Sequence, residues 1–420
     1  MSKLRFGCTL LILLTLCGSV HAKGGGFVNL FNGKDLTGWM IVGQPDGYVA
    51  KNGILICPAG SSSNLFTEKT YSDFIFRFQF KLTHGANNGV GIRAPLQGDA
   101  AYMGMEIQIL DDSDPSYSHL EPGQYCGSIY KVAPAKRGAL KPVGEWNKEE
   151  ITAIGRRIKV VLNNKTIVDA NLNDVTDPET LIEHPGMLRP SGHVGFLGHE
   201  PTEVDFKDIS IKDLSKQDKD NTPPKGFTAL FNGKNLNGWK ALVGNPPLRA
   251  KMTPEDLALK QAAADKLMKA HWTVKDGVIC YDGKNDNLCT KKDYKDFELW
   301  VDWKIEPKGD SGIYLRGSPQ VQIWDNPLGS GGLYNNLKNP SNPLVYADNP
   351  PGQWNHFQIL MIGDKVTVYL NNKLVTNAVT LENYWERDKP IYRTGQIELQ
   401  HHWSPLFFKN IYIREINDGN

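Results

Sequence analysis

The sequence predicts an all-β protein made of two tandem antiparallel β-sandwiches of jelly-roll type. Three observations predict this fold: a long internal repeat, strand-like alternation of apolar and polar residues in each copy, and a composition rich in turn-forming and aromatic residues. The chain has 420 residues, with 41 glycines, 25 prolines and 10% aromatic residues. This composition is typical of a loop-rich globular protein, and its 40% hydrophobic content excludes wholesale disorder.

The internal repeat fixes the domain organisation. Residues 27–39 (FVNLFNGKDLTGW) return as residues 227–239 (FTALFNGKNLNGW), an offset of 200. Further along, Phe74 corresponds to Phe297, an offset of 223, so the second copy contains an insertion of 223 minus 200, or 23, residues. A solenoid repeat is only about 20 to 50 residues long, so each copy is predicted to be a domain with its own core.

We place the first domain at residues 27–213 and the second at residues 227–416. The segment between them, residues 214–226, is polar and ends in Pro223-Pro224-Lys-Gly, which is typical of a short stiff linker.

Each copy shows the pattern of β-strands. Residues 74–82, 297–305 and 366–370 alternate with a period of two and are rich in aromatic and β-branched side chains. The Asn pairs at 163–164 and 371–372 are suited to the turns between such strands. Because no helical periods separate the strands, the pattern favours a sandwich over a parallel α/β sheet.

The insertion in the second copy is predicted to contain a helix. Thr253 supplies an N-cap, Pro254 fits the first helical position, and Glu255 and Asp256 suit the first turn. We expect a helix over about residues 254–269, packed as a lid on an edge of the sandwich.

The N-terminus resembles a secretory signal over residues 1–22. Lys3 and Arg5 precede an apolar run, and small residues follow at 20 and 22, as signal peptidase requires. The run is shorter than the roughly 20 apolar residues of a membrane-spanning helix. We therefore expect a secreted or periplasmic protein with no transmembrane segment after signal removal. A lipoprotein modified at Cys17 is the lesser alternative, because Leu16 is bulky.

Four cysteines would remain in the mature chain, in a compartment where disulfides can form. Cys280 and Cys289 flank a turn-rich stretch and could pair across a hairpin, and Cys57 with Cys126 is a second candidate pair. The cysteine and histidine spacings do not match a structural zinc site.

The balance of charge argues against nucleic acid as a partner. The chain has 47 Lys and Arg against 46 Asp and Glu, a net charge of +1, so it lacks the positive field that captures a phosphate backbone. The sequence does not predict an oligomeric state.

One strand in each copy has a polar face that is rich in amides. Residues two apart on a strand share a face. Glu106, Gln108 and Leu110 therefore lie together in the first copy, and their counterparts are Gln320, Gln322 and Trp324. Jelly-roll glycosidases use two carboxylates at a set separation. This strand carries one in the first copy and none in the second.

A second strand is more clearly suited to sugar. Residues 395–402 (GQIELQHH) place Gln396, Glu398, Gln400 and His402 on one face, which suggests a carbohydrate-binding groove. Trp324 would be a stacking platform for a pyranose ring.

The arginines at the ends of two corresponding apolar strands are further candidates. Arg93 follows Val90-Gly-Ile, and Arg316 follows Ile313-Tyr-Leu, with Tyr314 on the same side as Arg316. An isolated surface charge would be the ordinary interpretation, but the recurrence in both copies makes a functional role equally reasonable.

Several separated motifs give the repeat a resemblance to a known family. They are LFNGKxLxGW, GIxLR, QIxD, GxWN and GQIELQxH. With these motifs the sequence resembles the 3-keto-disaccharide hydrolase domain family. The resemblance implies a concanavalin A-like jelly roll and cleavage of glycosides already oxidised at C3. The second copy is closer to the pattern, because the first has Leu110 in place of Trp324 and Leu197-Gly198-His199 in place of residues 400–402.

The implied chemistry needs only isolated proton-transfer groups. A ketone at C3 acidifies the C2 proton, so a base can form an enediolate that expels the C1 substituent, and water can add back to give net hydrolysis. We expect Asp325 or His402 to act as base and acid and Arg316 as oxyanion partner or substrate clamp. The expected sugar contacts are Gln322, Gln400, Tyr314, Trp324 and Glu398.

The corresponding residues of the first copy are Asp111, His199 and Arg93 for catalysis, with Gln108 and Glu106 as sugar contacts. A divalent cation could replace the arginine, although the sequence shows no specific ligand set. Two alternatives remain: both copies are non-catalytic carbohydrate-binding modules, or the first copy binds and the second cleaves.

Overall fold

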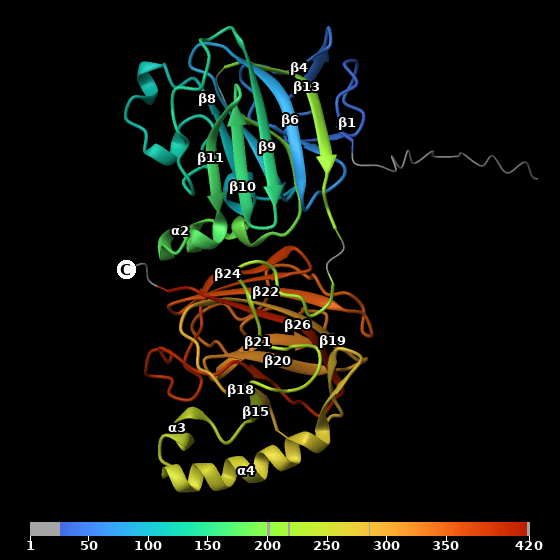
Figure 1. Ribbon diagram of the computed structural model, residues 1–420, viewed down its shortest axis with the longest axis vertical. Helices are drawn as coiled ribbons and strands as arrows, with labels where there is room; N and C mark the ends of the chain where they lie inside the picture. The colour runs from blue at the N-terminus through green and yellow to red at the C-terminus, as the bar shows by residue number, and fades with distance from the viewer. Residues whose placement is uncertain (1–25, 200–201, 217–218, 285, 418–420) are drawn as a thin grey trace, which may run out of the picture.

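The computed structural model describes residues 26–199, 202–216, 219–284 and 286–417, so the predicted signal at residues 1–22 lies outside the described part of the chain. The described chain is nearly all β and forms two sandwiches that follow one another along the longest axis (Figure 1). This confirms the predicted fold class. Among the described helices, none is long and apolar enough to cross a membrane.

Each sandwich pairs a large antiparallel sheet with a smaller one. In the first domain the orders are β11-β10-β9-β6-β13-β4-β3, with β1 beside β13, and β2-β5-β12-β7-β8. The strands are β1 (Val28–Asn29), β2 (Trp39–Val42), β3 (Val49–Lys51), β4 (Ile54–Cys57), β5 (Asn64–Thr67), β6 (Phe74–Leu82), β7 (Asn87–Ala94), β8 (Met105–Leu110), β9 (Trp146–Ile154), β10 (Arg157–Leu162), β11 (Lys165–Asn171), β12 (His193–His199) and β13 (Val204–Asp213). The helices are α1 (Ala100–Met103), η1 (Pro115–Tyr117), η2 (Pro122–Gln124), η3 (Leu172–Asp174), α2 (Pro178–Glu183) and η4 (Pro185–Leu188).

The second domain repeats this arrangement. Its orders are β16-β17-β26-β19-β22-β23-β24, with β14 beside β26, and β15-β18-β25-β20-β21. The strands are β14 (Thr228–Ala229), β15 (Trp239–Ala241), β16 (Trp272–Lys275), β17 (Val278–Tyr281), β18 (Leu288–Thr290), β19 (Phe297–Ile305), β20 (Asp310–Leu315), β21 (Ser318–Trp324), β22 (Asn355–Ile362), β23 (Lys365–Leu370), β24 (Lys373–Thr380), β25 (Glu398–Leu399) and β26 (Leu406–Glu415). The helices are α3 (Pro246–Arg249) and α4 (Pro254–His271).

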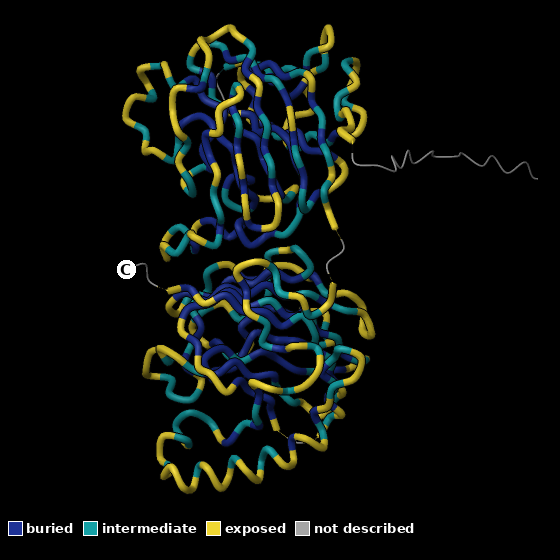
Figure 2. Tube along the Cα trace, in the orientation of Figure 1, coloured by how far each residue is buried: buried dark blue, intermediate teal, exposed yellow. Residues whose placement is uncertain are grey.

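Alternation along the strands builds the cores. In β6 the side chains of Phe74, Phe76, Phe78 and Phe80 are all buried between the two sheets, and the intervening residues face outward. Figure 2 shows the same buried layers inside both sandwiches. An aromatic side chain buries a large apolar area, so this period-two pattern drives the two sheets of each domain together.

The insertion folds as predicted and covers an edge of the small sheet. Thr253 caps α4 by accepting from the amide of Asp256, and the helix ends at His271, two residues beyond the expected boundary. Ala241 of the edge strand β15 donates its amide to Asp265 of the helix (2.9 Å) and accepts from Gln261 (2.9 Å). The outward side of α4 is exposed along its length (Figure 2).

The two domains meet through buried charges. Glu298 of β19 is fully buried and contacts Arg414 of the second domain (3.0 Å) and Arg156 of the first (3.3 Å). Arg189 of the first domain also donates to the carbonyl of Asn372 (2.7 Å). Glu298 lies on the outer face of the large sheet of the second domain, and the first domain covers it. The interface between the two sandwiches therefore contains buried charged side chains from both domains.

The proposed disulfides are wrong, because all four described cysteines are free. Cys280 belongs to β17 of the large sheet and Cys289 to β18 of the small sheet, so the turn-rich stretch between them crosses from one layer to the other instead of closing a hairpin. Cys57 ends β4 of the large sheet, while Cys126 lies in the loop that follows η2.

Candidate active site

The outer face of the small sheet in the second domain gathers the polar residues that the sequence placed on one side. Glu398 of β25 stands opposite Tyr314 of β20 and Cys289 of β18. Gln322 of β21 stands opposite Gly312 of β20. The alternate residues of these strands, such as Ile313 and Ile323, are buried in the core. Period-two alternation thus separates a polar outer face from an apolar inner one.

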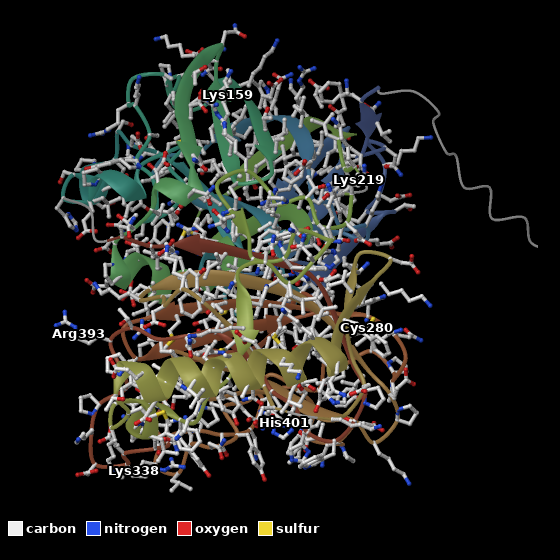
Figure 3. The ribbon with its side chains drawn as sticks, turned by 60° about the horizontal axis from the view of Figure 1, so that its bottom comes forward. Lys159, Lys219, Cys280, Lys338, Arg393 and His401 are labelled. Atoms are coloured by element: carbon white, nitrogen blue, oxygen red, sulfur yellow. The ribbon has the colours of Figure 1, made fainter. Side chains whose placement is uncertain are left out.

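A cavity of about 370 Å³ lies over this face. The segment before α3 forms one wall, and the stretch after β25 forms another. His401 of that stretch lies at the end of the molecule that carries the insertion (Figure 3). The lining residues are Leu242, Gly244, Asn245, Pro246, Asp286, Asn287, Tyr314, Gly317, Trp385, Glu398, Gln400, His401 and His402.

Glu398 is the buried acid of this cavity. Its side chain is 1% exposed, and one carboxyl oxygen accepts from Asn287 at 3.2 Å. Burial raises the pKa of Glu398 to about 7, while Arg249 and the Asn287 hydrogen bond partly oppose the rise. Its protonated and ionised forms are therefore both populated near neutral pH, which is the condition for efficient proton transfer.

Neutral hydrogen-bonding groups surround Glu398. Gln400 donates from Nε2 to the hydroxyl oxygen of Tyr314 at 3.2 Å, which leaves the phenolic hydrogen of Tyr314 free to donate. Burial, and then the negative charge of Glu398, raise the pKa of Tyr314, so this hydroxyl stays protonated. Among the described residues, the buried amide oxygen of Gln400 has no hydrogen-bond partner.

Two histidines lie beside these groups. His402 has a side chain that is 50% exposed, and its Nδ1 lies 3.5 Å from the carboxylate of Asp310. Burial lowers the pKa of His401, which favours its neutral form, and its buried Nδ1 has no partner in the described part of the chain. His402 is thus the more accessible proton donor.

The two arginines do not fit the role that we expected. The guanidinium of Arg316 donates to the carbonyls of Lys295 (2.5 Å) and Gly363 (2.7 Å) and to the carboxylate of Asp296 (2.6 Å). Arg93 donates in the same way to the carbonyl of Ser72 (2.8 Å). Both residues have positive φ values, 55° and 50°, and lie at the turn that ends the strand. They hold neighbouring loops together, so the geometry does not support an oxyanion partner or clamp.

Asp325 also lies away from the cavity. It is exposed beyond the end of β21, and its carboxylate accepts from the amide of Lys308 (2.8 Å). Asp111, its counterpart, is buried and accepts from the amide of Gly85 (2.9 Å). Asp325 is three residues from Gln322, and Asp111 is three residues from Gln108. By strand alternation, each Asp side chain therefore points to the face opposite that of the Gln. Of the residues to which we assigned roles, His402 therefore lines the cavity, whereas Arg316, Gln322 and Asp325 do not.

Trp324 and Gln322 are on the expected face but outside the cavity lining. The Trp324 ring donates to the carbonyl of Gly329 (2.6 Å) and meets Tyr334 edge to face, with ring centres 5.3 Å apart. Gln322 donates to Asp310 (2.8 Å) and accepts from Gln320. Their sugar contacts remain predictions.

The same face is filled in the first domain. The counterpart of Glu398 is Gly195, where a Cβ atom would lie 1.9 Å from the carbonyl oxygen of Leu65. Phe66 and Leu197 replace Cys289 and Gln400, and they pack with Ala100 of α1 in an apolar cluster. The buried Glu106 lies beside this cluster, and its carboxylate is 3.5 Å from Nε2 of His199. Gln108, the counterpart of Gln322, donates to Asn87 (2.9 Å).

One group of described side chains has the spacing of a cation site. The ligand atoms of His84, Asp111 and Asp114 lie within 4.8 Å of one another at the edge of the first domain. Asp111 and Asp114 already accept from Gly85, Ser113 and Ser116. The cluster lies in the first domain, remote from Glu398 of the second.

Comparison with known proteins identifies the family of the repeated domain. A family model described as a 3-keto-alpha-glucoside-1,2-lyase-like domain matches residues 26–212 and 226–414. The chain belongs to this family. Both matched segments correspond to the two sandwiches, so the 3-keto-alpha-glucoside-1,2-lyase-like domain occurs here twice, once with an open cavity and once with a filled face.

Individual relatives are distant. A protein of Bacteroides thetaiotaomicron named 3-keto-disaccharide hydrolase is 24% identical over 241 residues, covering 46% of this chain and 79% of the relative. Two crystal structures of candidate glycosyl hydrolases from Parabacteroides distasonis are 25% and 27% identical. They cover 45% and 49% of this chain and 100% and 93% of their own, with TM-scores of 0.41 and 0.35.

The sequence pointed to the face but not to the acid within it. Glu398 was expected only as a sugar contact, and Asn287 and Arg249 were missed. The available signal was a single carboxylate on an otherwise uncharged strand face. Its significance depends on burial beneath the insertion, which strand alternation does not reveal.

Proposed function

We propose that the second domain cleaves 3-keto-glycosides, with Glu398 as the base that removes the C2 proton. The observation that carries this proposal is a buried carboxyl with a pKa of about 7 in a cavity otherwise rich in neutral polar groups. Membership of the family and the name of the Bacteroides relative support the substrate class. A base near neutrality suits a proton that an adjacent ketone has already acidified.

The chemistry proceeds in two stages. The Glu398 carboxylate takes the C2 proton, and the C–H electron pair forms an enolate with the C3 carbonyl. The enolate electrons then return, the C1–C2 double bond forms, and the C1–O bond breaks with its electrons on the leaving oxygen, which takes a proton. Addition of water, with hydroxyl at C1 and hydrogen at C2, completes a net hydrolysis.

Other cavity residues supply the remaining functions. The free hydroxyl hydrogen of Tyr314 stabilises the negative charge on the C3 oxygen, and Gln400 holds the hydroxyl in place. His402, half exposed, donates the proton to the leaving oxygen. Tyr314 and Glu398 stand opposite each other on neighbouring strands, so one substrate can contact both.

The first domain, in this proposal, has no catalytic role. Gly195, Phe66 and Leu197 leave neither the acid nor the space that the reaction requires. We also propose that the protein acts outside the cytoplasm after removal of residues 1–22.

Glu398→Gln tests the base directly. With a nitrophenyl 3-keto-glucoside we expect kcat/KM to fall at least 100-fold, because removal of a general base typically costs a factor of 10² to 10⁴. In the wild type, kcat/KM should rise with pH up to about 7 as Glu398 ionises, and deuterium from solvent should enter at C2.

Matched controls are Asp325→Asn and Glu106→Gln, each expected to retain activity within about twofold. If Glu398→Gln keeps more than a tenth of the activity with the fold intact, the assignment is wrong. Binding of unoxidised glycans without any turnover of 3-keto-glycosides would instead favour a non-catalytic carbohydrate-binding protein.

A further inference from the structure

A second cavity of about 630 Å³ adjoins the first, between the insertion and the small sheet. Its lining includes the cationic side chains of Lys240, Arg249, Lys291 and Arg316, against a single acid, Asp293. The charge of Arg316 is already paired with Asp296. The other three cations form no ion pair within 4 Å among the described residues. Arg249 donates to the carbonyl of Gly244 and lies near Glu398, so the lining carries more positive than negative charge.

The cavity also offers a neutral acceptor. Gln396 lines it, is buried, and its amide oxygen has no hydrogen-bond partner in the described chain. A buried acceptor without a partner costs free energy, so a ligand that donates a hydrogen bond to it would be stabilised. Sulfate or chloride brings charge but no hydroxyl hydrogen, whereas an acidic sugar brings both.

The two cavities meet at Gly317. A Cβ atom placed on this glycine would lie 3.5 Å from the Glu398 carboxylate, 3.6 Å from the Arg249 guanidinium and 3.2 Å from the Pro246 ring. Pro246 lines both cavities. A ligand in the Glu398 cavity can thus extend past Arg249 into the cationic one.

The first domain shows that these cations are not required by the fold. The positions of Lys240 and Lys291 carry Met40 and Glu68 in the first copy. Arg249 belongs to the insertion, which the first domain lacks. Of the four cationic positions, the first domain therefore keeps only the counterpart of Arg316, which is Arg93.

From these observations we propose that the cationic cavity binds a negatively charged sugar unit, uronate or sulfated, linked to the sugar in the Glu398 cavity. This inference rests on the proposed function for the order of the two units, although the binding itself needs no turnover. The cations select the charged group, and Gln396 accepts from a ring hydroxyl. The protein would then act on acidic oligosaccharides in preference to neutral ones.

Binding of unoxidised disaccharides tests the proposal without catalysis. We would titrate a disaccharide containing one glucuronate unit, its 6-sulfated glucose analogue and its neutral glucose parent, by calorimetry. We expect both acidic compounds to bind about tenfold more tightly than the parent at 50 mM salt, and the advantage to shrink at 500 mM salt. The ratio of the two acidic compounds tells which source of charge is preferred.

The double variant Lys240→Met, Lys291→Glu, which installs the residues of the first domain, should abolish the advantage. The matched control is Lys260→Met on the exposed side of α4, which should retain it. Equal binding of acidic and neutral compounds by the wild type, or an advantage unchanged in the double variant, overturns the proposal. Selective acidic binding with no cleavage of any 3-keto-glycoside supports this cavity but contradicts the proposed function.

Discussion

The small sheets of the two domains have the same strand order and face outward in the same way, yet one is hollow and the other is filled. In the first domain, α1 and the side chains of Phe66 and Leu197 close the face. In the second, the insertion with α3 and α4 leaves space above Glu398. Each copy thus covers its sheet with a different connection.

This difference teaches that the sandwich itself does not determine where chemistry occurs. A cavity needs small or polar residues on the face and a cover that stands away from it. Both domains retain one buried carboxyl near this face, Glu106 in the first and Glu398 in the second, but on different strands. Glu398 lines a cavity, whereas Glu106 contacts His199 beside the packed cluster.

The largest expected effect on stability concerns the large sheets, where the two domains differ at the interface between them. Glu298 has Ile75 as its counterpart in the first domain, and only Glu298 is buried between domains. Glu298→Ala would leave Arg156 and Arg414 buried without their partner, so we expect a loss of about 3–5 kcal/mol. Calorimetry should show unfolding of the variant at a lower temperature than that of the wild type, or in two separate transitions.

The control for this variant is Asp169→Ala, which removes an exposed ion pair with Arg157 and should cost less than about 1 kcal/mol. Equal stability of the two variants would mean that the domains do not depend on each other through Glu298.

A somewhat smaller effect is expected in the cores. Glu149 is 2% exposed, neither of its carboxyl oxygens has a partner among the described residues, and burial raises its pKa to about 8. Its counterpart is Phe357. The folded protein holds this proton and the unfolded chain releases it above pH 4.5. The contribution of Glu149 to stability therefore falls as pH rises from about 4.5 to about 8 and is constant beyond.

Glu149→Gln removes this titration. We expect the variant to exceed the wild type by roughly 3 kcal/mol at pH 8.5 and by much less at pH 5, measured by urea unfolding. The matched control is Glu145→Gln, which removes an exposed carboxyl from the same region. An identical slope in Glu149→Gln would show that this carboxyl does not stay protonated in the fold.

The smallest expected effect sharpens the comparison of the two faces. Leu197→Ala should cost about 2 kcal/mol, because it opens a void in a packed cluster. Gln400→Ala, at the equivalent position, should cost less than about 1 kcal/mol, because it enlarges a cavity that already exists. Denaturant midpoints of the two variants measure the difference. Similar losses would contradict the distinction between a filled face and an open one.

Much of the fold could be predicted from local patterns. The repeat defined two domains, alternation in strands such as residues 74–82 defined the sandwich, and Thr253 with Pro254 marked the start of α4. The site was harder. Arg316 looked like a substrate ligand, but its carbonyl partners Lys295 and Gly363 come from loops that only the folded chain brings together. Asp325 was chosen because it is a carboxylate, although strand alternation from Gln322 places it on the opposite face.

The insertion that covers the cavity is a continuous piece of chain between β15 of the small sheet and β16 of the large sheet, and it includes Arg249. The proposed proton-transfer groups come from other stretches, at Tyr314 and residues 398–402. Of the three cations other than Arg316 in the second cavity, the insertion supplies Arg249, whereas Lys240 and Lys291 lie outside it. Exchange of residues 242–271 between relatives would accordingly alter the wall that carries Arg249 and leave Glu398, Lys240 and Lys291 in place.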